Sequence, residues 1–472
     1  MASGNSVIFS GENSLYSKVV PTDQQYETLQ LAWNELRDFL IPHIRKTYAY
    51  TLKTWIQGSY KYRTLIRPLA KEESYDLDLG VYFLTEEVEG ASASSLREMI
   101  SDGLTAYMEV CENVKKIEKQ KRRCLRIVYK DDFHIDIPVY ILDEDSDLRT
   151  LAVLPDDWEH SDPKQLYMWF KQIVPESERS AVRRLIQYIK AWAIVNFRLN
   201  QGAAISSITT TVLAARFYSS LPSTFISWND EERLIEFVKW MRNELAEGFR
   251  VNNPINLSEN LCRIEDANKS FTTDKINILR AAVEQAEAAE TCDEAIIAWE
   301  QAFGYLIELP TDVDVLLAET SDIAKSYLPV VTPTSNPPSI KIKVLSKDKK
   351  TVLRTCINAV ANLTKENSLD FSIENSHELP PNSRAIWTVR NGGQEASDVF
   401  DLGHITHAAS LNQTIHETIA YTGRHFMDCA IVTGAKVHSL VRVPVHVGGL
   451  FASISHALSE NRRIKRFRGR VK

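Results

Sequence analysis

An acidic pair inside a strand-like segment is the feature that most constrains this chain. In YDLDLGVYF, residues 75–83, Asp76 and Asp78 flank Leu77 within an otherwise apolar run. Side chains at positions i and i+2 of a strand project from the same face, so the two carboxylates point together. Half-burying two such charges is unfavourable unless a cation pairs them. The segment therefore predicts a cation site on one face of a sheet.

A third acid lies in a second strand-like segment, FHIDIPVY, which places Asp136 between two isoleucines. The turn signal Asp131-Asp132 predicts that strands over residues 125–130 and 133–141 pair in antiparallel fashion. If the strand of residues 75–83 also joins them, three carboxylates converge. Such a set suits two hard divalent cations, which prefer oxygen donors. Two ions of this kind bind a triphosphate and activate an attacking hydroxyl in phosphoryl transfer.

A Gly-Ser pair precedes the acids and supplies what a triphosphate needs on its other side. Gly58 lets the backbone approach a ligand closely, and Ser59 offers a hydroxyl and an N–H. Phosphate oxygens favour such a loop at the start of a helix. Taken alone, a Gly-Ser pair or an Asp-x-Asp is more often structural. The combination with a later strand-borne acid favours a catalytic site.

The residue pattern changes along the chain, from helical to strand-like. With 472 residues the chain is too long for a single hydrophobic core, so more than one domain is expected. Residues 178–328 show helical periodicity, and LPVVTPTSNPPS then holds four prolines, which predicts a boundary. The segments beyond it read as strands. We expect an α+β protein with a core over 1–177, a helical lobe over 178–328, a linker over 329–338 and a β-rich domain over 339–472.

Composition narrows the partners and the location. The net charge of −7 argues against a protein wrapped in nucleic acid, although residues 115–126 and the tail 462–472 are strongly basic. Each basic segment is interpreted either as a solvated surface or as a contact for phosphates or a partner. Six scattered cysteines without a CxxC, no signal-like start and no long apolar run predict a cytoplasmic protein that does not engage a membrane.

These motifs resemble the nucleotidyltransferase superfamily of the DNA polymerase β type, and more closely its cGAS/DncV-like (SMODS) members. The strings QGSYKYRT, residues 57–64, and YDLDLGVY, residues 75–82, carry the resemblance. The Asp-Pro-Lys of 162–164 and the helix around 184–192 support it. It covers about residues 20–328 and implies a polymerase β-like core, a small mixed sheet with helices, completed by a helical lobe.

The resemblance also implies roles for single residues. It makes Asp76, Asp78 and Asp136 the ligands of two Mg²⁺ ions, for which Mn²⁺ is a substitute, with Asp136 placed to activate the acceptor hydroxyl. Nucleoside triphosphates are the implied substrates. The implied nucleotide contacts are Gln57, Gly58, Ser59, Lys190 and one of Ser206 and Ser207, between which the sequence does not decide.

Residues 339–472 resemble the adenylyl/guanylyl and SMODS C-terminal sensor domain. The motif WTVRNGG, residues 387–393, and the run from Glu417 to Cys429 carry this second resemblance. It implies a domain that senses a nucleotide-like ligand. The candidate contacts are Trp387, Arg424 and His425, and a plain packing role is an equal interpretation of Trp387.

The family resemblance implies an enzyme that joins nucleoside triphosphates into a small signalling oligonucleotide, cyclic or linear, and releases pyrophosphate. Its product would control a separate effector protein in bacterial anti-phage defence. One alternative is a template-independent polymerase that extends a nucleic-acid or protein acceptor along residues 115–126. A catalytically inactive nucleotide-sensing module is another, against which the intact acids argue.

Overall fold

The chain divides into two compact units, Met1–Glu287 and Ala288–Lys472. The structure is a computed structural model that describes residues 4–11, 13–69, 74–131, 133–197, 200–307, 337–433 and 436–448. Helices with a mixed sheet in the first unit and two further sheets in the second confirm the predicted α+β class. Most of the predicted linker lies outside the described residues, and the predicted domain bounds stay predictions.

An eight-stranded mixed sheet forms the centre of the first unit, in the order β3-β4-β5-β2-β6-β7-β8 with β1 beside β2. Strand β2 pairs in parallel with β5 and β6 along one edge and antiparallel with β1 along the other. The strands are β1 (Leu52–Gln57), β2 (Tyr75–Leu84), β3 (Val114–Ile117), β4 (Leu125–Tyr129), β5 (Phe133–Ile137), β6 (Val139–Asp143), β7 (Leu148–Val153) and β8 (Asp157–His160).

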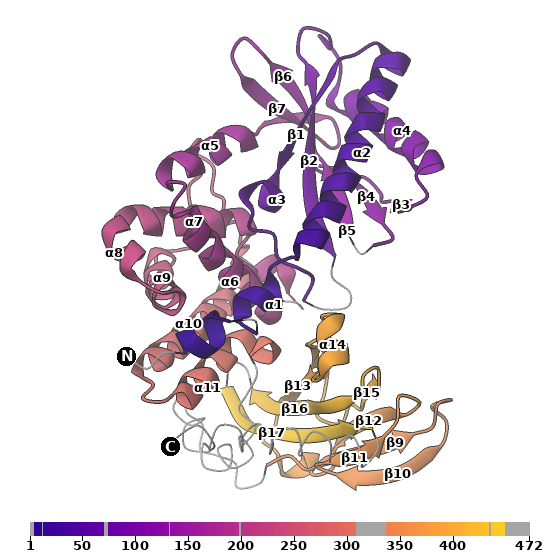
Figure 1. Cartoon of the computed structure of the whole chain (residues 1–472), viewed down its shortest axis with the longest axis vertical. Helices are drawn as coiled ribbons and strands as arrows, with labels where there is room; N and C mark the ends of the chain where they lie inside the picture. Colours follow the sequence, from indigo (N-terminus) through magenta and orange to yellow (C-terminus); the bar gives the residue numbers. More distant parts are fainter. Residues whose placement is uncertain are drawn as a thin grey trace, which may run out of the picture. The chain divides into compact units, whose positions relative to one another are not determined.

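Two helices, α2 (Asp23–Tyr48) and α4 (Ala93–Val110), cover one face of this sheet (Figure 1). Leu77 and Leu79 of β2 are fully buried in the core that these helices share with the sheet. Because strand side chains alternate, the acids of the Asp-x-Asp motif project from the opposite face. The apolar core is thus on one side of β2 and the charged positions are on the other.

Apolar residues at helical spacing over residues 22–41 predict a helix that Pro42 should end or kink, but the helix in the structure is longer. Thr22 caps α2 as expected, but Pro42 lies inside the helix, which continues to Tyr48. Proline removes one helical hydrogen bond, yet Ile44 extends the buried stripe of Leu36 and Leu40 by another turn. Burial of that stripe outweighs the lost bond.

The expected strand over residues 133–141 is two strands, β5 and β6, which are separated at Pro138. Proline has no N–H to donate to a sheet ladder, so the ladder is interrupted there. The carbonyl of Pro138 still accepts a hydrogen bond from the N–H of Val81 at 3.1 Å. Both halves therefore stay on the same edge of β2.

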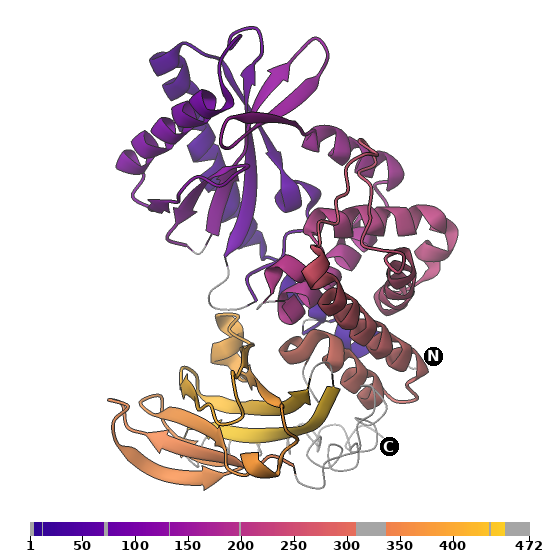
Figure 2. The ribbon, with the colours of Figure 1, turned by 180° about the vertical axis from the view of Figure 1, so that it is seen from behind.

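Helices make up the rest of the first unit and lie beside the sheet (Figure 2). Trp192, Phe217 and Phe237 are fully buried among them. The helices are α1 (Leu15–Val19), α3 (Gly58–Tyr62), α5 (Pro163–Ile173), α6 (Arg179–Phe197), α7 (Ser207–Ser220), α8 (Pro222–Ser227), α9 (Asp230–Glu244) and α10 (Asp266–Ala288).

The second unit holds two sheets, one in the order β10-β9-β12-β15 and the other in the order β11-β17-β16-β13-β14. Ile342 and Phe371 of the first sheet and Trp387 and Ile431 of the second belong to one shared apolar core. The elements are α11 (Cys292–Phe303), β9 (Ile340–Leu345), β10 (Val352–Ile357), β11 (Val360–Leu363), β12 (Ser368–Ile373), β13 (Arg384–Arg390), α14 (Gln394–Asp398), β14 (Gly403–His407), β15 (Ile415–Thr418), β16 (Gly423–Thr433) and β17 (Lys436–Val447).

Helix α11 belongs to this second unit, whereas the sequence interpretation groups it with the helical lobe.

A buried arginine fixes the loop that leads into β4. Arg97 of α4 has no solvent exposure, and its guanidinium donates to the carbonyls of Lys121 at 2.6 Å, Cys124 at 3.1 Å and Ala152 at 3.0 Å. Burial lowers the pKa of Arg97 below its usual value. These bonds tie the basic segment and β7 to α4, and so they set where β4 begins.

Replacing Arg97 tests how much its hydrogen bonds to these carbonyls contribute to stability. We expect Arg97→Met to lower the free energy of unfolding by about 2–4 kcal/mol, because buried carbonyls lose their donors. Urea unfolding followed by tryptophan fluorescence measures the change. Arg280→Met, which removes an exposed pair with Glu284 on α10, is the control and should cost about 0.5 kcal/mol or less. Equal effects of the two substitutions would contradict a structural role for Arg97.

Candidate active site

Strand register brings the three acids to one place on the open face of the sheet. Asp78 of β2 stands directly opposite Asp136 of β5, and Asp76 stands opposite His134. On the other edge of β2, Gln57 at the end of β1 pairs with Asp78. Since residues opposite each other in adjacent strands share a face, all of these side chains project from the same side.

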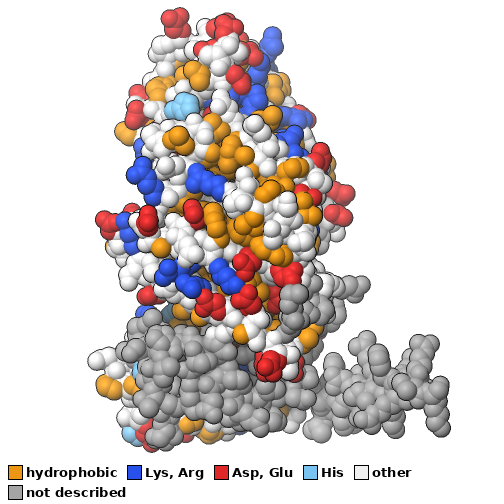
Figure 3. Space-filling view, turned by 90° about the vertical axis from the view of Figure 1, so that its left-hand side faces the viewer, with side chains coloured by type: hydrophobic (Ala, Val, Ile, Leu, Met, Phe, Trp, Pro, Cys, Tyr) orange, Lys and Arg blue, Asp and Glu red, His pale blue; other side chains and the backbone are white. Residues whose placement is uncertain are grey.

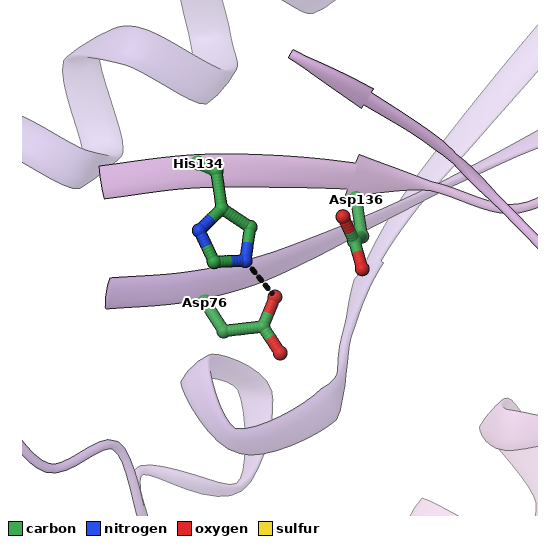
Figure 4. Close-up of side chains that lie close together, drawn as sticks. All are labelled: Asp76, His134 and Asp136. Atoms are coloured by element: carbon green, nitrogen blue, oxygen red, sulfur yellow. Dashed lines mark ion pairs between the residues drawn. The ribbon is translucent and has the colours of Figure 1, made fainter. Parts of the chain in front are cut away.

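One group of ligand atoms here has the spacing of a metal site. Asp76, His134 and Asp136 each offer one ligand atom, and these atoms lie within 4.8 Å of one another (Figure 4). The Nε2 atom of His134 lies 2.9 Å from Oδ1 of Asp76, and its Nδ1 lies 2.8 Å from Oγ of Ser74. Oxygen and imidazole donors in this arrangement fit a divalent cation.

His134 was missed by the sequence analysis. Its position two residues before Asp136 on the same strand is the signal that would have identified it.

An arginine, also missed from the sequence, neutralises part of this acidic face. Arg126 of β4 stands opposite Asp136 and holds it with two bonds, Nε to Oδ1 at 2.5 Å and Nη2 to Oδ2 at 2.7 Å. The same Nη2 lies 3.8 Å from Oδ1 of Asp76. Partial burial raises the pKa of Asp76, but its bond to His134 and the charge of Arg126 outweigh this and lower it.

Asp78 carries the least compensated of the three charges. Burial raises its pKa well above the usual range, and the neighbouring carboxylates of Asp76 and Asp136 raise it further. Its side chain also packs against the start of α3, because a Cβ added to Gly58 would lie 1.8 Å from Oδ2 of Asp78. Gly58 has φ +63°, which glycine adopts without strain. The predicted glycine position is therefore required by the acid itself.

Gln57, a predicted nucleotide contact, is buried and forms hydrogen bonds with two tyrosines of the protein. Its Nε2 lies 3.2 Å from the hydroxyl of Tyr140, and its Oε1 accepts from the hydroxyl of Tyr82 at 3.3 Å. The two tyrosine rings are stacked with centroids 4.8 Å apart. Both ends of the buried amide are thus bonded within the protein, where they position the residues just before Gly58. A nucleotide contact by Gln57 stays a prediction.

Lys190 of α6 lies close enough to Asp76 and Asp78 for their charges to act on its pKa, and its predicted contact with the triphosphate stays a prediction. Its Nζ donates to the carbonyl of Thr64 at 2.7 Å. Burial lowers its pKa to about 8, although the charges of Asp76 and Asp78 act in the opposite direction.

The two predicted serines lie at the start of α7. Ser206 is its N-cap, and its Oγ accepts from the N–H of Thr209 at 3.3 Å. Ser207 is the first residue of the helix, and both serines are exposed. Their predicted phosphate contacts, and the choice between them, stay predictions.

The basic segment of residues 115–126 is extensively paired with acids. Arg122 and Arg123 both bind Glu159 at 2.5 Å, and Lys116 binds Glu118 at 2.9 Å. On a different face of the chain, the one drawn in Figure 3, lysine and arginine side chains also lie among acidic ones. The basic tail lies outside the described residues.

Within the part of the chain that the structure describes, no helix combines the length and apolarity needed to span a bilayer.

The predicted contacts in the second unit lie in different environments. Trp387 is fully buried in the apolar core. His425 is buried as well: its Nδ1 accepts from the N–H of Gly392 at 3.2 Å, and its Nε2 lies 3.1 Å from the carbonyl oxygen of Tyr421. Arg424 is exposed, with its guanidinium 5.0 Å from the ring centre of Phe426. Ligand contacts by these residues stay predictions.

Two stretches of the chain match described protein families. Residues 52–140 match "Cyclic GMP-AMP synthase DncV-like, nucleotidyltransferase domain". Residues 318–448 match "Adenylyl/Guanylyl and SMODS C-terminal sensor domain". The first match contains all three acids and the Gly-Ser pair, and the second contains the three candidate sensor contacts.

Known relatives are similar over much of the chain. A cyclic GMP-AMP synthase of Escherichia albertii is 28% identical over 406 residues, 86% of this chain and 86% of that protein. A c-di-GMP synthase of Roseivirga ehrenbergii is 27% identical over 241 residues, 45% of this chain and 61% of that protein. The crystal structure of the 3'-deoxy GTP bound form of Vibrio cholerae DncV has a TM-score of 0.55 at 20% identity, and the match covers 64% of this chain and 95% of that one. At that identity the structural likeness shows a shared fold.

The close approach of Asp78 to Gly58 can be tested by adding one methyl group. We expect Gly58→Ala to lower the free energy of unfolding by about 2–5 kcal/mol, because the positive φ is strained for alanine and Cβ overlaps Asp78. Gly90→Ala is the matched control, since Gly90 has φ +79° and nothing within 4 Å of its added Cβ. Its cost should be about 1–2 kcal/mol. Equal losses in urea unfolding would show that the contact with Asp78 is unimportant.

Proposed function

The chain is a DncV-like nucleotidyltransferase with a C-terminal adenylyl/guanylyl and SMODS sensor domain, and we propose that it joins nucleoside triphosphates into a signalling oligonucleotide. The observation that carries the proposal is the convergence of Asp76, Asp78 and Asp136 beside the Gly58 turn. The similarity of the chain to a cyclic GMP-AMP synthase over 86% of its length supports a cyclic dinucleotide as the product.

In the proposed reaction, a hydroxyl of one nucleotide attacks the α-phosphorus of another nucleoside triphosphate, and pyrophosphate leaves. Asp76, Asp78 and Asp136 would hold divalent cations, Mg²⁺ in the first place, which neutralise the triphosphate and stabilise the charge that develops during transfer. Asp136 is proposed to receive the proton of the attacking hydroxyl. Its place in the register opposite Asp78 puts it beside the two other acids.

The phosphates are proposed to lie over the start of α3 and near Lys190. Gly58 and Ser59 begin α3, where backbone N–H groups have no helical partner. The ammonium of Lys190 would add a positive charge close to the acids. Together these groups would place a triphosphate between the N–H groups of α3 and the carboxylate cluster. The protein would then contribute by orienting the triphosphate rather than by forming a covalent bond to it.

The biological setting extends the proposal. The product would control a separate effector protein in bacterial anti-phage defence, and the chain would act in the cytoplasm. The similarity of residues 318–448 to a sensor domain supports a second nucleotide-like ligand in that region, which the exposed Arg424 would contact.

The proposal predicts that the acid pair is essential for product formation. We expect Asp76→Ala combined with Asp78→Ala to lower product formation on the order of 1,000-fold or more, since the lost cation stabilisation amounts to several kcal/mol. The fold should be unchanged or more stable, because the double substitution removes the burial of the Asp78 carboxylate and its repulsion by the neighbouring acids, which together raise its pKa. Asp266→Ala, which removes an exposed acid paired with Lys269 on α10, is the control.

Labelled ribo- and deoxynucleoside triphosphates with Mg²⁺, followed by phosphatase and mass spectrometry, provide the measurement. Cyclic products resist phosphatase, whereas linear oligonucleotides and extended acceptors lose terminal phosphates. Undiminished turnover in the double variant would overturn the assignment of the acids. An absence of product from the unaltered chain with every triphosphate would favour the inactive sensing module.

Lys190 gives the reaction a predicted pH dependence. A pKa of about 8 means that the ammonium loses its proton as pH rises through that value. Attraction for the triphosphate should then fall, and kcat/KM, which reports groups of the free enzyme, should decline above about pH 8. In Lys190→Arg the charge persists, because guanidinium stays protonated, so this decline should disappear. The same decline in both proteins would assign it to another group.

A further inference from the structure

Arg126 occupies the side of the acidic cluster where a cation would bind. Its guanidinium addresses both oxygens of Asp136, at 2.5 and 2.7 Å, and one of its nitrogens lies 3.8 Å from Asp76. The side chain of Arg126 is only 19% exposed and that of Asp136 only 12%. A bidentate, partly buried pair of this kind is among the stronger ion pairs that proteins form.

The sheet fixes this contact. Arg126 and Asp136 are directly opposite each other in the antiparallel ladder of β4 and β5. The entry into β4 is held in turn, because the carbonyl of Cys124 accepts a hydrogen bond from buried Arg97 at 3.1 Å. Arg126 therefore projects toward the acids from a paired strand, and its position follows from the register.

The charge of Arg126 substitutes for part of the charge of a metal ion. The positive or potentially positive groups that face the three acids are Arg126, Lys190 and His134. Of these, Arg126 has two hydrogen bonds to one carboxylate, and Lys190 has its hydrogen bond to the carbonyl of Thr64. Arg126 is thus the group whose contacts overlap most with those of a divalent ion.

Arg126 and a divalent ion would address the same carboxylate oxygens, and each guanidinium hydrogen bond occupies a lone pair that the ion could use. A divalent ion among Asp76, His134 and Asp136 would use a carboxylate oxygen of Asp136 that now accepts from Arg126. It would also lie a few ångströms from a like charge, which is unfavourable at low dielectric. We propose that Arg126 competes with divalent cations for Asp136 and Asp76, so that a metal ion binds only when the guanidinium turns away.

This inference rests on the proposed function only in taking these carboxylates as the metal ligands. It concerns the affinity for the metal and is independent of which product the chain makes. Its consequence is that the free protein binds divalent ions weakly, and that loading the site requires another partner for the guanidinium.

Binding of Mn²⁺ to the full chain without nucleotide tests the proposal, with free Mn²⁺ measured by electron paramagnetic resonance. In Arg126→Gln we expect the Kd for Mn²⁺ at this site to fall at least about tenfold, because hydrogen bonds to a charged group no longer have to be broken. Lys190→Gln removes a positive charge near the same acids without removing a bond to a carboxylate, and it should change the Kd by less than about threefold.

The outcomes separate direct competition from a general charge effect. An unchanged or weaker affinity in Arg126→Gln, or an equal gain in Lys190→Gln, would overturn the proposal. Should Arg126→Gln fail to fold, Arg126→Lys replaces it. That variant keeps the charge but loses the two-pronged contact, and an affinity gain of about threefold or more would support competition.

The Mn²⁺ measurement and the product assay together distinguish this inference from the proposed function. A gain in Mn²⁺ affinity in a protein that joins no triphosphates would overturn the function and leave the competition intact. Product formation by the unaltered chain with no affinity gain in Arg126→Gln would do the reverse.

Discussion

Repulsion among three carboxylates is the constraint on which the site depends. Asp76, Asp78 and Asp136 share one face of adjacent strands, and Asp78 responds with a raised pKa because it is buried beside the other two. A fold tolerates such a group when positive charge lies nearby or when the acid keeps its proton. Arg126 and Lys190 supply that charge in part, and Asp78 remains short of it.

A second acidic position in the chain shows how a purely structural acid differs. Asp428 of β16 is buried between Arg390, at 2.7 Å, and Arg442, at 2.6 Å. Burial raises the pKa of Asp428, but the two guanidinium groups outweigh it and the pKa falls below its usual value. Asp78 has the opposite net shift. A buried acid that is fully paired stabilises a core, whereas one left short of positive charge indicates a site for a ligand.

Packing behind the acids determines where their side chains lie. Gly58 has no Cβ, which lets α3 approach Asp78 closely. The side-chain amide of Gln57, the residue before Gly58, forms hydrogen bonds with Tyr82 and Tyr140. On the far side, Arg97 holds the loop that leads to Arg126. Sites that bind charged ligands by orientation need such support, because small displacements weaken every electrostatic contact.

The sequence by itself determined which residues of each strand share a face. Alternation is a local property, so the side-by-side projection of Asp76 and Asp78, and the need for a nearby cation, followed from a few residues. The tertiary structure alone decided the register between strands, which places Asp136 opposite Asp78 and Arg126 opposite Asp136. It also showed that α2 continues past Pro42, because the buried apolar face of the helix extends beyond Pro42 to Ile44. Contacts between distant segments depend on how whole strands and helices pack, and no local pattern encodes that.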